Sequence, residues 1–471
     1  MTHYDLIIIG TGSGNSVLDQ RYDGLKVAIV EKGTFGGTCL NVGCIPTKMF
    51  VYSAEVAGTV RDSARFGVDA SVNSVHWPEI RDRIFGRIDP IAEGGRKYRA
   101  EDSPNVTVYA SQAHFTERKS LETADGRTLS ADKIVIATGS HVSLPPVDGL
   151  TDDVIANPAL PVHTSDTVMR LESLPGSMLV LGSGYIAAEM AHIFSALGTR
   201  VTLIARSGVL LSAQDGDISR RFTEDVTDRW DVRFNASTQS VRATPSGIEL
   251  DYTDFDGECA TVAADVLLVA TGRRPSTDAL RLDAAGYDTH IDGRVAVDQY
   301  QRVLTDGNPV DGVFALGDAS SEYQLKHVAN HEARVVAENL LAAEEGELIS
   351  HDHRFVPSAV FSHPQIASVG LTEEQARHAG INYVTVVQDY GSVAYGWAME
   401  DSRSFAKLIA DKSTGQLIGA HIIGGSASMI IQPMIQAMAF GIPAKDLARG
   451  QYWIHPALPE VLENALLELQ L

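Results

Sequence analysis

The same pattern occurs twice in this chain: a short apolar strand, a glycine-rich turn, a helical stretch and a second strand. The first copy joins Tyr4–Ile9 to Lys26–Val30, and the second joins Met178–Leu181 to Arg200–Ile204. A further apolar strand follows each copy, at 133–139 and 265–272, and both end in the same turn. Continuous apolar runs of this length are typical of strands buried in parallel sheets. The repeat therefore predicts two α/β domains of one design, the second inserted in the first.

The last third of the chain has a different pattern. Gly312–Asp318 is one more strand that ends in a glycine and an acidic residue. A helical run follows from His327 to Ala343, and the acidic stretch Glu344–Glu347 after it indicates a linker. From Phe355 onward, short apolar segments mix with helices such as Ser428–Phe440. We predict an α/β fold with two Rossmann-like dinucleotide-binding domains, one inserted in the other, and a C-terminal α+β domain. The predicted boundaries are 1–150 and 273–347 for the first domain, 151–272 for the second and 348–471 for the third.

Charge and cysteine content limit the classes of partner and compartment. The 471 residues carry a formal charge of −22, which repels nucleic acid and anionic lipid surfaces, so neither is an expected partner. A mean hydropathy of −0.02, with no apolar run near the ~20 residues that span a bilayer, argues against a membrane protein. Three cysteines cannot build a disulfide framework, which favours the reducing cytoplasm.

The first glycine-rich turn has the features of a dinucleotide site. Gly10, Gly12 and Gly14 follow a strand, where glycine lets the backbone approach a pyrophosphate and a helix start offers N–H donors. Glu31 ends the next strand, where a carboxylate accepts from ribose hydroxyls. The usual third glycine position holds Asn15, with Gly14 one residue early. We therefore expect the contact between helix and strand to accommodate a side chain.

The second glycine-rich turn fits the spacing without irregularity, with Gly182, Gly184 and Ala187. The position equivalent to the ribose-binding acid is Ala205, and Arg206 follows it. Losing the acid removes a repulsion against a 2′-phosphate, and a guanidinium suits that phosphate. We predict that this domain binds NADPH; the alternative is an ordinary surface arginine.

Cys39 and Cys44 lie between the first dinucleotide unit and the next helix. In an ideal helix they would be about 7.5 Å apart along the axis, too far for a disulfide, so pairing requires a distorted segment, for which Gly43 and Pro46 are candidates. A cycling redox pair is the favoured interpretation, because a helix start and cationic neighbours activate thiols. A zinc site is the alternative, but it would need further Cys or His ligands near the pair. Cys259 is better interpreted as a buried, inert cysteine, and we place it in a hairpin. His351 and His353 are expected in a solvated loop, and no metal site is predicted.

The segment GGTCLNVGCIPTK at 36–48 resembles the redox-active disulfide of the class I flavoprotein disulfide reductases, a family that includes glutathione, trypanothione and mycothione reductases, dihydrolipoamide dehydrogenases and mercuric reductases. The resemblance covers essentially the whole chain, through ATGS at 137–140, GSGYIAAE at 182–189, ATGRRP at 270–275, ALGDAS at 315–320, VFSHPQIASVGLTE at 360–373 and His455–Glu460. It implies that the first nucleotide is FAD and that the enzyme is a homodimer built through the third domain.

The resemblance also implies roles for single residues. Cys44 is similar to the thiolate that exchanges electrons with FAD, and Cys39 to the thiol that attacks the substrate disulfide. His455 resembles the acid–base residue that the other subunit contributes, oriented by Glu460. The remaining correspondences are an ion pair of Lys48 with Glu189, a lid over the nicotinamide pocket at Tyr185, FAD contacts at Thr38, Gly139 and Asp318, and a nucleotide-domain arginine at Arg273.

Within the family, the substrate is indicated by positions at which this chain differs from the better-known branches. Ala205 and Arg206 count against dihydrolipoamide dehydrogenases, and the absence of cysteines after Cys259 excludes the usual route of mercuric reductases. Gln20, with Arg21 adjacent, stands where glutathione reductases carry a substrate-binding arginine. The GTGSGNS turn, the short first helix, Ser392–Asp401 and the ending QYWIHPALPEVLENAL resemble the branch that reduces mycothione, the disulfide of a pseudodisaccharide thiol. A glutathione reductase-like enzyme and a docking subunit like dihydrolipoamide dehydrogenase are the alternatives. Ala457 replaces a threonine found in many relatives, which bears on how His455 is positioned.

Overall fold

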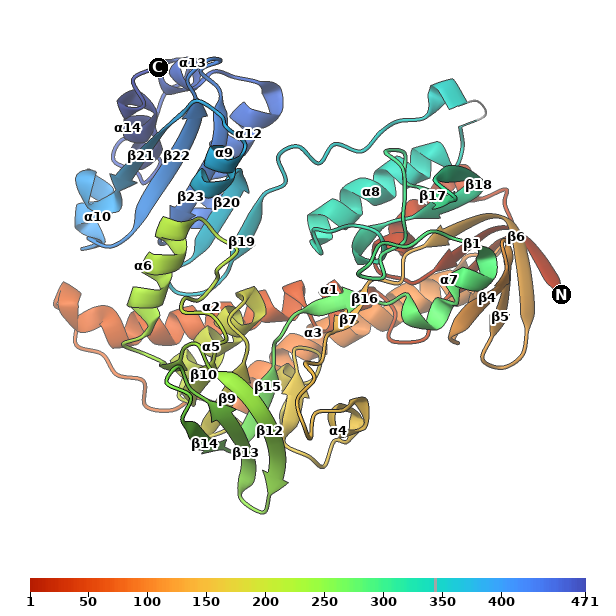
Figure 1. Cartoon of the computed structure of the whole chain (residues 1–471), viewed down its shortest axis with the longest axis horizontal. Coiled ribbons are helices and arrows are strands. Elements are labelled where there is room, and N and C mark those ends of the chain that lie inside the picture. Colours follow the sequence, from red (N-terminus) through yellow and green to blue (C-terminus); the bar gives the residue numbers. More distant parts are fainter. Residues whose placement is uncertain (343–344) are drawn as a thin grey trace. The chain divides into compact units, whose positions relative to one another are not determined.

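The computed structural model describes residues 1–342 and 345–471, and the chain folds into two compact units. Unit 1 comprises residues 1–49, 78–143 and 272–352, and unit 2 comprises 50–77, 144–271 and 353–471. Figure 1 labels the helices and strands. Both dinucleotide patterns and the C-terminal domain form regular structure, so the predicted α/β class is confirmed. The four-segment domain division remains a prediction.

Unit 1 is built on a mainly parallel sheet in the order β17-β18-β6-β1-β2-β3, with β5 pairing β6 and β4 pairing β5. Leu6 of β1 pairs Val27 of β2, and Ile7 pairs Ile134 of β6. The sheet is buried on both faces, because Leu6 and Ile8 enter one apolar cluster while Ile7 and Ile9 enter another. Its strands are β1 (Thr2–Ile9), β2 (Val27–Val30), β3 (Val106–Tyr109), β4 (Ala113–Glu117), β5 (Ser120–Thr123), β6 (Thr128–Ile136), β17 (Arg302–Thr305) and β18 (Asn308–Ala315).

Helices and a short two-stranded sheet complete unit 1. The sheet pairs β7 (Ser140–Val142) with β16 (Arg273–Pro275). The helices are α1 (Gly37–Asn41), the first turn of α2 (Cys44–Asp62), α3 (Trp77–Lys97) from Pro78 onward, the π-helical turn η4 (Tyr98–Asp102), α7 (Leu282–Ala285) and α8 (Lys326–Asn339), with 3-10 turns η1 (Ser13–Val17), η2 (Gln20–Tyr22), η6 (Asp278–Leu280), η7 (Gly317–Ala319) and η8 (Glu345–Glu347). The predicted helix at 327–343 thus ends at Asn339. Ala343 and Glu344, the first residue of the predicted linker, lie outside the described residues.

Unit 2 repeats the parallel arrangement. Its first sheet has the order β11-β10-β9-β15-β8, with β9 between β10 and β15 as β1 lies between β2 and β6. The strands are β8 (Val162–Thr164), β9 (Ser177–Leu181), β10 (Arg200–Ile204), β11 (Asp231–Arg233) and β15 (Val266–Val269), and an antiparallel sheet contains β12 (Ser237–Thr244), β13 (Gly247–Thr253) and β14 (Cys259–Ala264). The associated helices are α4 (Asp152–Ala156), α5 (Tyr185–Leu197) and α6 (Gly216–Val226), with turns η3 (Ser63–Phe66) and η5 (Val168–Arg170).

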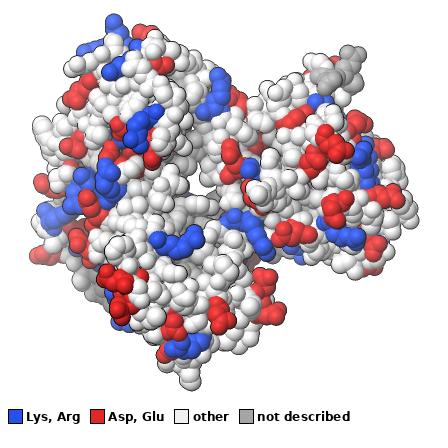
Figure 2. All heavy atoms as spheres, viewed as in Figure 1, with Lys and Arg blue, Asp and Glu red and all other residues white. Residues whose placement is uncertain are grey.

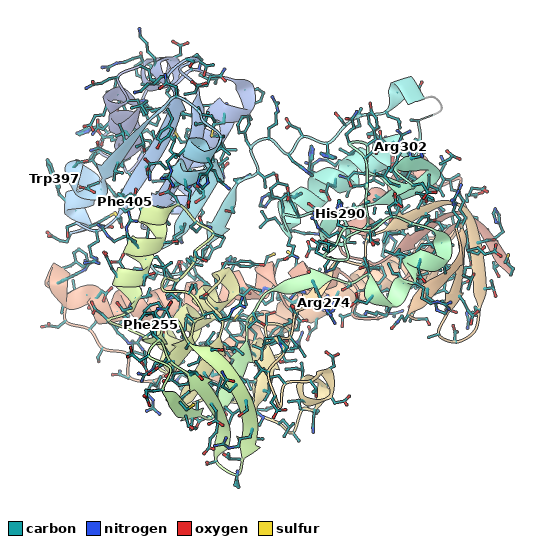
Figure 3. All side chains as sticks on the ribbon, in the orientation of Figure 1. Phe255, Arg274, His290, Arg302, Trp397 and Phe405 are labelled. Carbon is teal, nitrogen blue, oxygen red and sulfur yellow. The ribbon has the colours of Figure 1, made fainter. Side chains whose placement is uncertain are left out.

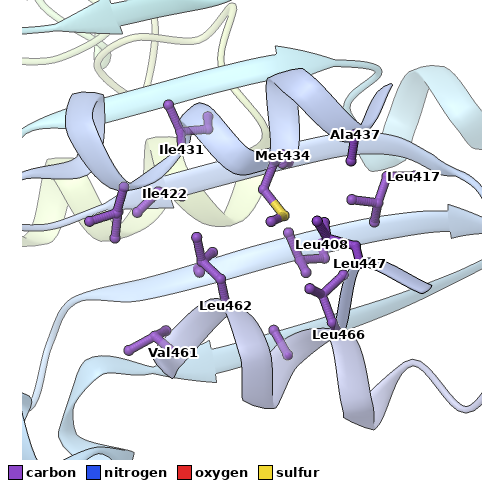
Figure 4. Packing of buried hydrophobic residues seen from close by; sticks show 14 of the residues in the cluster. Leu408, Leu417, Ile422, Ile431, Met434, Ala437, Leu447, Val461, Leu462 and Leu466 are labelled. Atoms are coloured by element: carbon purple, nitrogen blue, oxygen red, sulfur yellow. The ribbon is translucent and has the colours of Figure 1, made fainter. Parts of the chain in front are cut away.

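The C-terminal part of unit 2 is an antiparallel sheet with helices, as predicted. The order β19-β20-β23-β22-β21 joins β19 (Ser358–Val360), β20 (Ile366–Gly370), β21 (Tyr383–Asp389), β22 (Phe405–Asp411) and β23 (Leu417–Ile423). Helices α9 (Glu373–His378), α10 (Ala394–Ala398), α11 (Ala427–Ile430), α12 (Gln432–Phe440), α13 (Ala444–Arg449) and α14 (Glu460–Glu468) accompany it, with turn η9 (Tyr390–Ser392). Leu408, Met434 and Leu462 meet in its core (Figure 4). Within this part, Trp397 lies on α10 and Phe405 begins β22 (Figure 3).

The first dinucleotide pattern departs from the prediction after its turn. Five residues of 3-10 helix, Ser13–Val17, replace the expected α-helix, because Leu18 and Asp19 adopt extended conformations and end the winding. The second pattern does continue into an α-helix, the 13-residue α5. The helix-dipole argument for the first loop therefore fails, since a single short turn has no sizeable dipole.

Surface and hydropathy give two further observations. On the face drawn in Figure 2, acidic and basic side chains are interspersed. No helix among residues 1–342 and 345–471 combines the length and apolar character needed to cross a bilayer.

Candidate active site

The first glycine loop is closely packed against its neighbours. Gly10 has a φ of +101°, and a Cβ there would lie 2.3 Å from the carbonyl oxygen of Ala137, so only glycine fits. A Cβ on Gly37, which begins α1, would lie 2.6 Å from the Cα of Gly12. The loop and the start of the cysteine-bearing segment therefore touch backbone to backbone, as the adjacent roles predicted for them require.

The predicted accommodation of a side chain at the third glycine position is wrong. A Cβ on Gly14 would lie 2.7 Å from the Cβ of Ala137, so Gly14 itself makes the close contact with the sheet. Asn15 turns aside, and its Oδ1 accepts a hydrogen bond of 2.9 Å from Nε of Arg99. The 3-10 winding moves the close approach one residue toward the N-terminus, which explains the irregular spacing.

Glu31 orders the loop from the end of β2. Its Oε2 accepts from the backbone N–H and the hydroxyl of Thr11, at 2.9 and 2.7 Å, and its Oε1 accepts from the N–H of Gly33 at 2.8 Å. These bonds hold the carboxylate beside the glycine loop. Its role toward a ribose stays a prediction.

Buried hydroxyl groups in unit 1 fit a bound dinucleotide. Within the part of the chain that is described, the hydroxyl oxygens of Thr138 and Ser320 are buried and have no hydrogen-bond partner. The Cα of Thr138 is 3.3 Å from the Cβ position of Gly10, so one such hydroxyl belongs to the turn beside the glycine loop. Buried polar groups are normally satisfied, and a bound ligand would supply the partners. The residues present therefore fit FAD.

The other residues assigned to FAD occupy the same unit. Asp318, in η7, accepts a hydrogen bond of 2.5 Å from the hydroxyl of Ser140, which follows Gly139. Arg273 donates to that hydroxyl at 2.9 Å and to the carbonyl of Ser140 at 2.7 Å. Arg273, expected as an arginine of the nucleotide domain, thus belongs to unit 1, and Thr38 is exposed near the start of α1.

The two cysteines lie on either side of a helix break, as the spacing argument requires. Cys39 lies in α1 and Cys44 is the first residue of α2; Val42, with φ −143°, and Gly43 separate the helices. A Cβ on Gly43 would lie 2.9 Å from the carbonyl oxygen of Thr38, so the sharp turn needs glycine there. Pro46, the other residue expected to cause distortion, lies inside the first turn of α2.

The side chains of Cys39 and Cys44 are hydrogen-bonded to each other. This bond, together with burial and the charge of Cys44, raises the pKa of the Cys39 thiol far above its usual range, while Lys326 acts in the opposite direction. Cys44 begins a 19-residue helix, and the amino end of a helix favours a negatively charged side chain.

The second glycine loop has open space where a pyrophosphate would approach. Gly182 has a φ of +137°, and a Cβ there would lie 2.3 Å from the carbonyl oxygen of Ala270, whereas a Cβ on Gly184 would meet no atom within 4 Å. Tyr185, the first residue of α5, is 43% exposed, and Ala187 is fully buried. The residues present fit a dinucleotide.

The end of β10 bears on the choice of nucleotide. Ala205 is fully buried, with backbone hydrogen bonds to Arg233 and Ala236, whereas the Arg206 side chain is exposed. A guanidinium beside a position without a carboxylate is available to an anionic ligand.

Glu189 and Lys48 were predicted to form an ion pair. Glu189 lies in α5, is 8% exposed, and its Oε1 accepts a hydrogen bond of 2.8 Å from the N–H of Phe361. Lys48 lies in the first turns of α2, in unit 1, whereas Glu189 belongs to unit 2. The pair itself stays a prediction.

His455 and Glu460 form the predicted couple at the start of α14. Nδ1 of His455 lies 2.7 Å from Oε1 of Glu460, and the backbone N–H of Ala457 donates to Oε2 at 3.1 Å. The hydrogen bond from His455 lowers the pKa of Glu460. Because the backbone of Ala457 fixes the carboxylate, a threonine side chain is not needed there to position His455.

The remaining cysteine and histidines have other surroundings. Cys259 is exposed, which contradicts the expected burial, although its predicted hairpin is present because Cys259 pairs Thr253 across β13 and β14. Nδ1 of His351 lies 3.0 Å from Nε2 of Gln301. Over the described ranges 1–342 and 345–471, no three His, Cys, Asp or Glu residues are grouped so as to hold a metal ion.

Two side chains that support the site were not predicted. Nζ of Lys326 donates to the hydroxyl of Ser13 at 2.8 Å, and Arg99 donates to Asn15. Each partner pair is far apart in sequence, and no motif marks either cation. Only the sheet order of unit 1 brings them together.

Comparison with known proteins agrees with this geometry. The family profile described as "Pyridine nucleotide-disulphide oxidoreductase" matches residues 4–333, and the profile of its dimerisation domain matches 356–466. The chain is 52% identical to mycothione reductase of Mycobacterium tuberculosis, with 100% of both chains covered. It is 36% identical to mercuric reductase of Streptomyces lividans, over 97% of this chain and 94% of that protein. Among solved structures, an HOCl-induced flavoprotein disulfide reductase from Escherichia coli superposes with a TM-score of 0.83 at 28% identity, covering 98% of this chain and 99% of that chain.

Proposed function

The chain belongs to the pyridine nucleotide-disulphide oxidoreductase family, and we propose that within this family it is an NADPH-dependent, FAD-containing mycothione reductase. The overall reaction converts NADPH, a proton and one mycothione into NADP⁺ and two molecules of mycothiol. The observation that carries the proposal is the arrangement of Cys39 and Cys44, which lie on two helices separated by a glycine turn, with α1 packed against the first glycine loop.

The chain's own residues carry out the sulfur chemistry. FAD, held by the first glycine loop and Glu31, would supply the two-electron path from NADPH to the Cys39–Cys44 disulfide. The Cys39 thiolate then attacks one sulfur of mycothione, so that a mixed disulfide forms and the first mycothiol leaves as a thiolate. His455, held by Glu460, gives that thiolate a proton. The Cys44 thiolate then attacks the sulfur of Cys39, which restores the Cys39–Cys44 disulfide and releases the second mycothiol as a thiolate that takes up a proton from solvent.

Two observations support NADPH and mycothione over the family's other reactants. Arg206 is exposed beside the buried Ala205, which suits a 2′-phosphate. Arg21, adjacent to the position of the glutathione-binding arginine, is held by Asp19 and Glu338 at 2.7 Å each. An arginine engaged in this way is a poor clamp for a glutathione carboxylate.

The proposal includes a homodimer built through the C-terminal domain, in which His455 of one subunit serves the cysteine pair of the other. Residues 356–466 match the family's dimerisation domain and expose Met429, Phe440 and Ile454 by 73%, 77% and 77%. A second subunit that covers these side chains would remove their apolar surface from water. We place the enzyme in the cytoplasm, where a reducing environment suits a cycling thiol pair.

Steady-state turnover of one enzyme batch on mycothione, oxidised glutathione and lipoamide, each with NADPH and with NADH, tests the proposal. We expect kcat/KM to be highest for mycothione with NADPH, and Cys39→Ser to abolish turnover while FAD remains bound. A preference for lipoamide with NADH would identify a dihydrolipoamide dehydrogenase and contradict the proposal. Cys259→Ser is the matched control, since this exposed cysteine belongs to neither helix.

A further inference from the structure

We propose that Lys326 is a positioning residue of the cysteine pair: its ammonium group, fixed between the first glycine loop and the start of α8, stabilises the thiolate form of Cys39. The inference rests on the proposed function, because it assigns a thiolate role to Cys39. It concerns a residue outside the glycine, cysteine and histidine motifs that carry the predicted chemistry.

The backbone around the pair leaves little freedom. The Gly36 N–H donates to the hydroxyl of Thr11 at 3.0 Å, and Gly37 lies directly against Gly12. Cys39 comes two residues after Gly37, and Ser13 comes directly after Gly12. A cation bound to Ser13 is therefore held next to the segment that carries Cys39.

Lys326 is bound there through a defined set of contacts. Its Nζ donates to the Ser13 hydroxyl at 2.8 Å, and that hydroxyl donates to Oδ1 of Asn330 at 3.0 Å. Asn330 lies one turn further along the same helix, α8. Ser13 is 7% exposed and Lys326 is half-buried, so solvent screens this charge less than a surface lysine.

The sign of the electrostatic effect follows from the charges around Cys39. Two ionisable side chains from neighbouring helices act on its thiol: Cys44 of α2 raises the pKa of Cys39, as burial does, and Lys326 of α8 lowers it. Cys39 must lose its proton before it attacks a disulfide. Removing the lysine charge should therefore reduce the thiolate fraction, and with it the rate of the first exchange step.

A structural role alone would have a different consequence. If Lys326 served only to hold the glycine loop, its loss would lower FAD retention but leave the reactivity of Cys39 at each pH unchanged. An FAD-phosphate contact would act in the same way. The pH profile of Cys39 separates these roles.

The test uses the FAD-loaded enzyme, reduced with one equivalent of NADPH, and measures iodoacetamide alkylation of Cys39 by peptide mapping between pH 5 and 10. In Lys326→Met, we expect the alkylation rate to fall about tenfold at each pH in this range, because loss of the lysine charge raises the pKa of Cys39 further. Lys326→Arg, which keeps the charge, should stay within about twofold of wild type. Lys412→Met, an exposed lysine in unit 2, is the matched control.

Coinciding profiles for wild type and Lys326→Met would overturn the inference. If Lys326→Met does not retain FAD, Asn330→Leu serves instead, because it removes the Ser13–Asn330 hydrogen bond that helps to fix Lys326 on Ser13 and keeps the charge. We then expect a smaller fall in the alkylation rate, and a profile unchanged from wild type would count equally against the inference. Failure of the wild-type enzyme to expose a reactive Cys39 on reduction would instead contradict the proposed function.

Discussion

At the scale of single residues, the His455–Glu460 couple shows how a short segment can hold an imidazole in place. The imidazole is 73% exposed, while the carboxylate that binds it is 18% exposed and also accepts from the backbone of Ala457. The hydrogen bond from His455 lowers the pKa of Glu460, so the carboxylate stays ionised across the neutral range and fixes the imidazole tautomer.

His455→Ala should spare flavin reduction by NADPH and lower mycothione turnover by about 10²- to 10⁴-fold, because proton delivery contributes only to the disulfide half-reaction. Stopped-flow absorbance measures the first step, and thiol release measures the second. His378→Ala, on the exposed face of α9, is the control and should change neither. Equal losses in both half-reactions would rule out this division of labour.

Arg206→Glu should raise the KM for NADPH by about tenfold to hundredfold, because it replaces a charge-assisted hydrogen bond to the 2′-phosphate with a repulsion. The KM for NADH should change little, since NADH has no such phosphate. Arg377→Glu, an exposed arginine of α9, controls for the change in net charge. An unaltered KM for NADPH would mean that another residue holds the phosphate.

Cys39 and Cys44 could be predicted as a redox pair from their segment with its glycine and proline, whereas the role of His455 followed only from the resemblance to the family. No sequence pattern predicted the contacts of Lys326 and Arg99. Lys326 contacts Ser13 and Arg99 contacts Asn15 only after η1, η4 and α8 are brought together. The exposure of Cys259 was missed for a related reason, since a hairpin's sequence does not show which of its faces is covered.

At the scale of elements, the main departure is the short 3-10 turn after the first glycine loop. Without an α-helix, the carbonyls of Asn15 and Leu18 lack helical partners, and Arg99 donates to them at 3.2 and 3.4 Å. Burial lowers the pKa of this guanidinium, which nevertheless stays charged at all physiological pH. One arginine thus replaces part of the hydrogen bonding that a helix would supply.

Arg99→Ala should destabilise unit 1 by about 1–3 kcal/mol, because the partly buried carbonyls of Asn15 and Leu18 would lose their donor. The loss would appear as a lower midpoint of urea unfolding and as faster FAD release on dilution. Arg96→Ala, which removes an exposed arginine paired with Glu93, is the matched control and should leave both unchanged. If Arg99→Ala and Arg96→Ala have the same urea midpoint and the same rate of FAD release, Arg99 does not support the loop.

A buried ionic cluster joins α6, α9 and β22 in unit 2. Nζ of Lys407, whose side chain is 3% exposed, lies 2.9 Å from Asp215, 2.6 Å from Asp217 and 2.5 Å from Glu373. Burial alone would lower the pKa of Lys407, but hydrogen bonds to these carboxylates hold it above its usual range. Burial likewise would raise the pKa of Asp215, yet bonds from the Glu373 N–H and Lys407 keep it below its usual value.

Lys407→Met should lower the free energy of unfolding by about 3–5 kcal/mol near neutral pH, since it leaves Asp215 buried without its cation. Because the folded-state pKa of Asp215 is depressed, its stabilising contribution is present above the unfolded value of about 4 and is lost as the pH falls through the folded value. The gap between wild type and variant should therefore shrink in acid. Denaturant unfolding at several pH values measures it, and a gap that widens in acid would contradict the assignment.

At the scale of the whole molecule, the repeated strand pattern predicted the most. The two parallel sheets have their glycine-bearing strands in equivalent positions, and the α+β character of the third domain also follows from its pattern. The pattern does not predict which segments of the chain make up each of the two compact units. Residues 50–77 group with unit 2, because Phe50 stacks on Trp77, and Trp77 packs 5.3 Å from Phe194 of α5. Such aromatic contacts join segments that no local pattern links.

The central claim is that electrons from NADPH arrive at Cys39 and Cys44. The most direct measurement is peptide-mapped alkylation of the FAD-loaded enzyme before and after one equivalent of NADPH, with Cys259 as the internal reference because it is exposed and belongs to no pair. The account predicts that Cys259 is labelled equally in both samples, while Cys39 and Cys44 are labelled only after NADPH. Labelling of Cys39 and Cys44 that is the same with and without NADPH would contradict it.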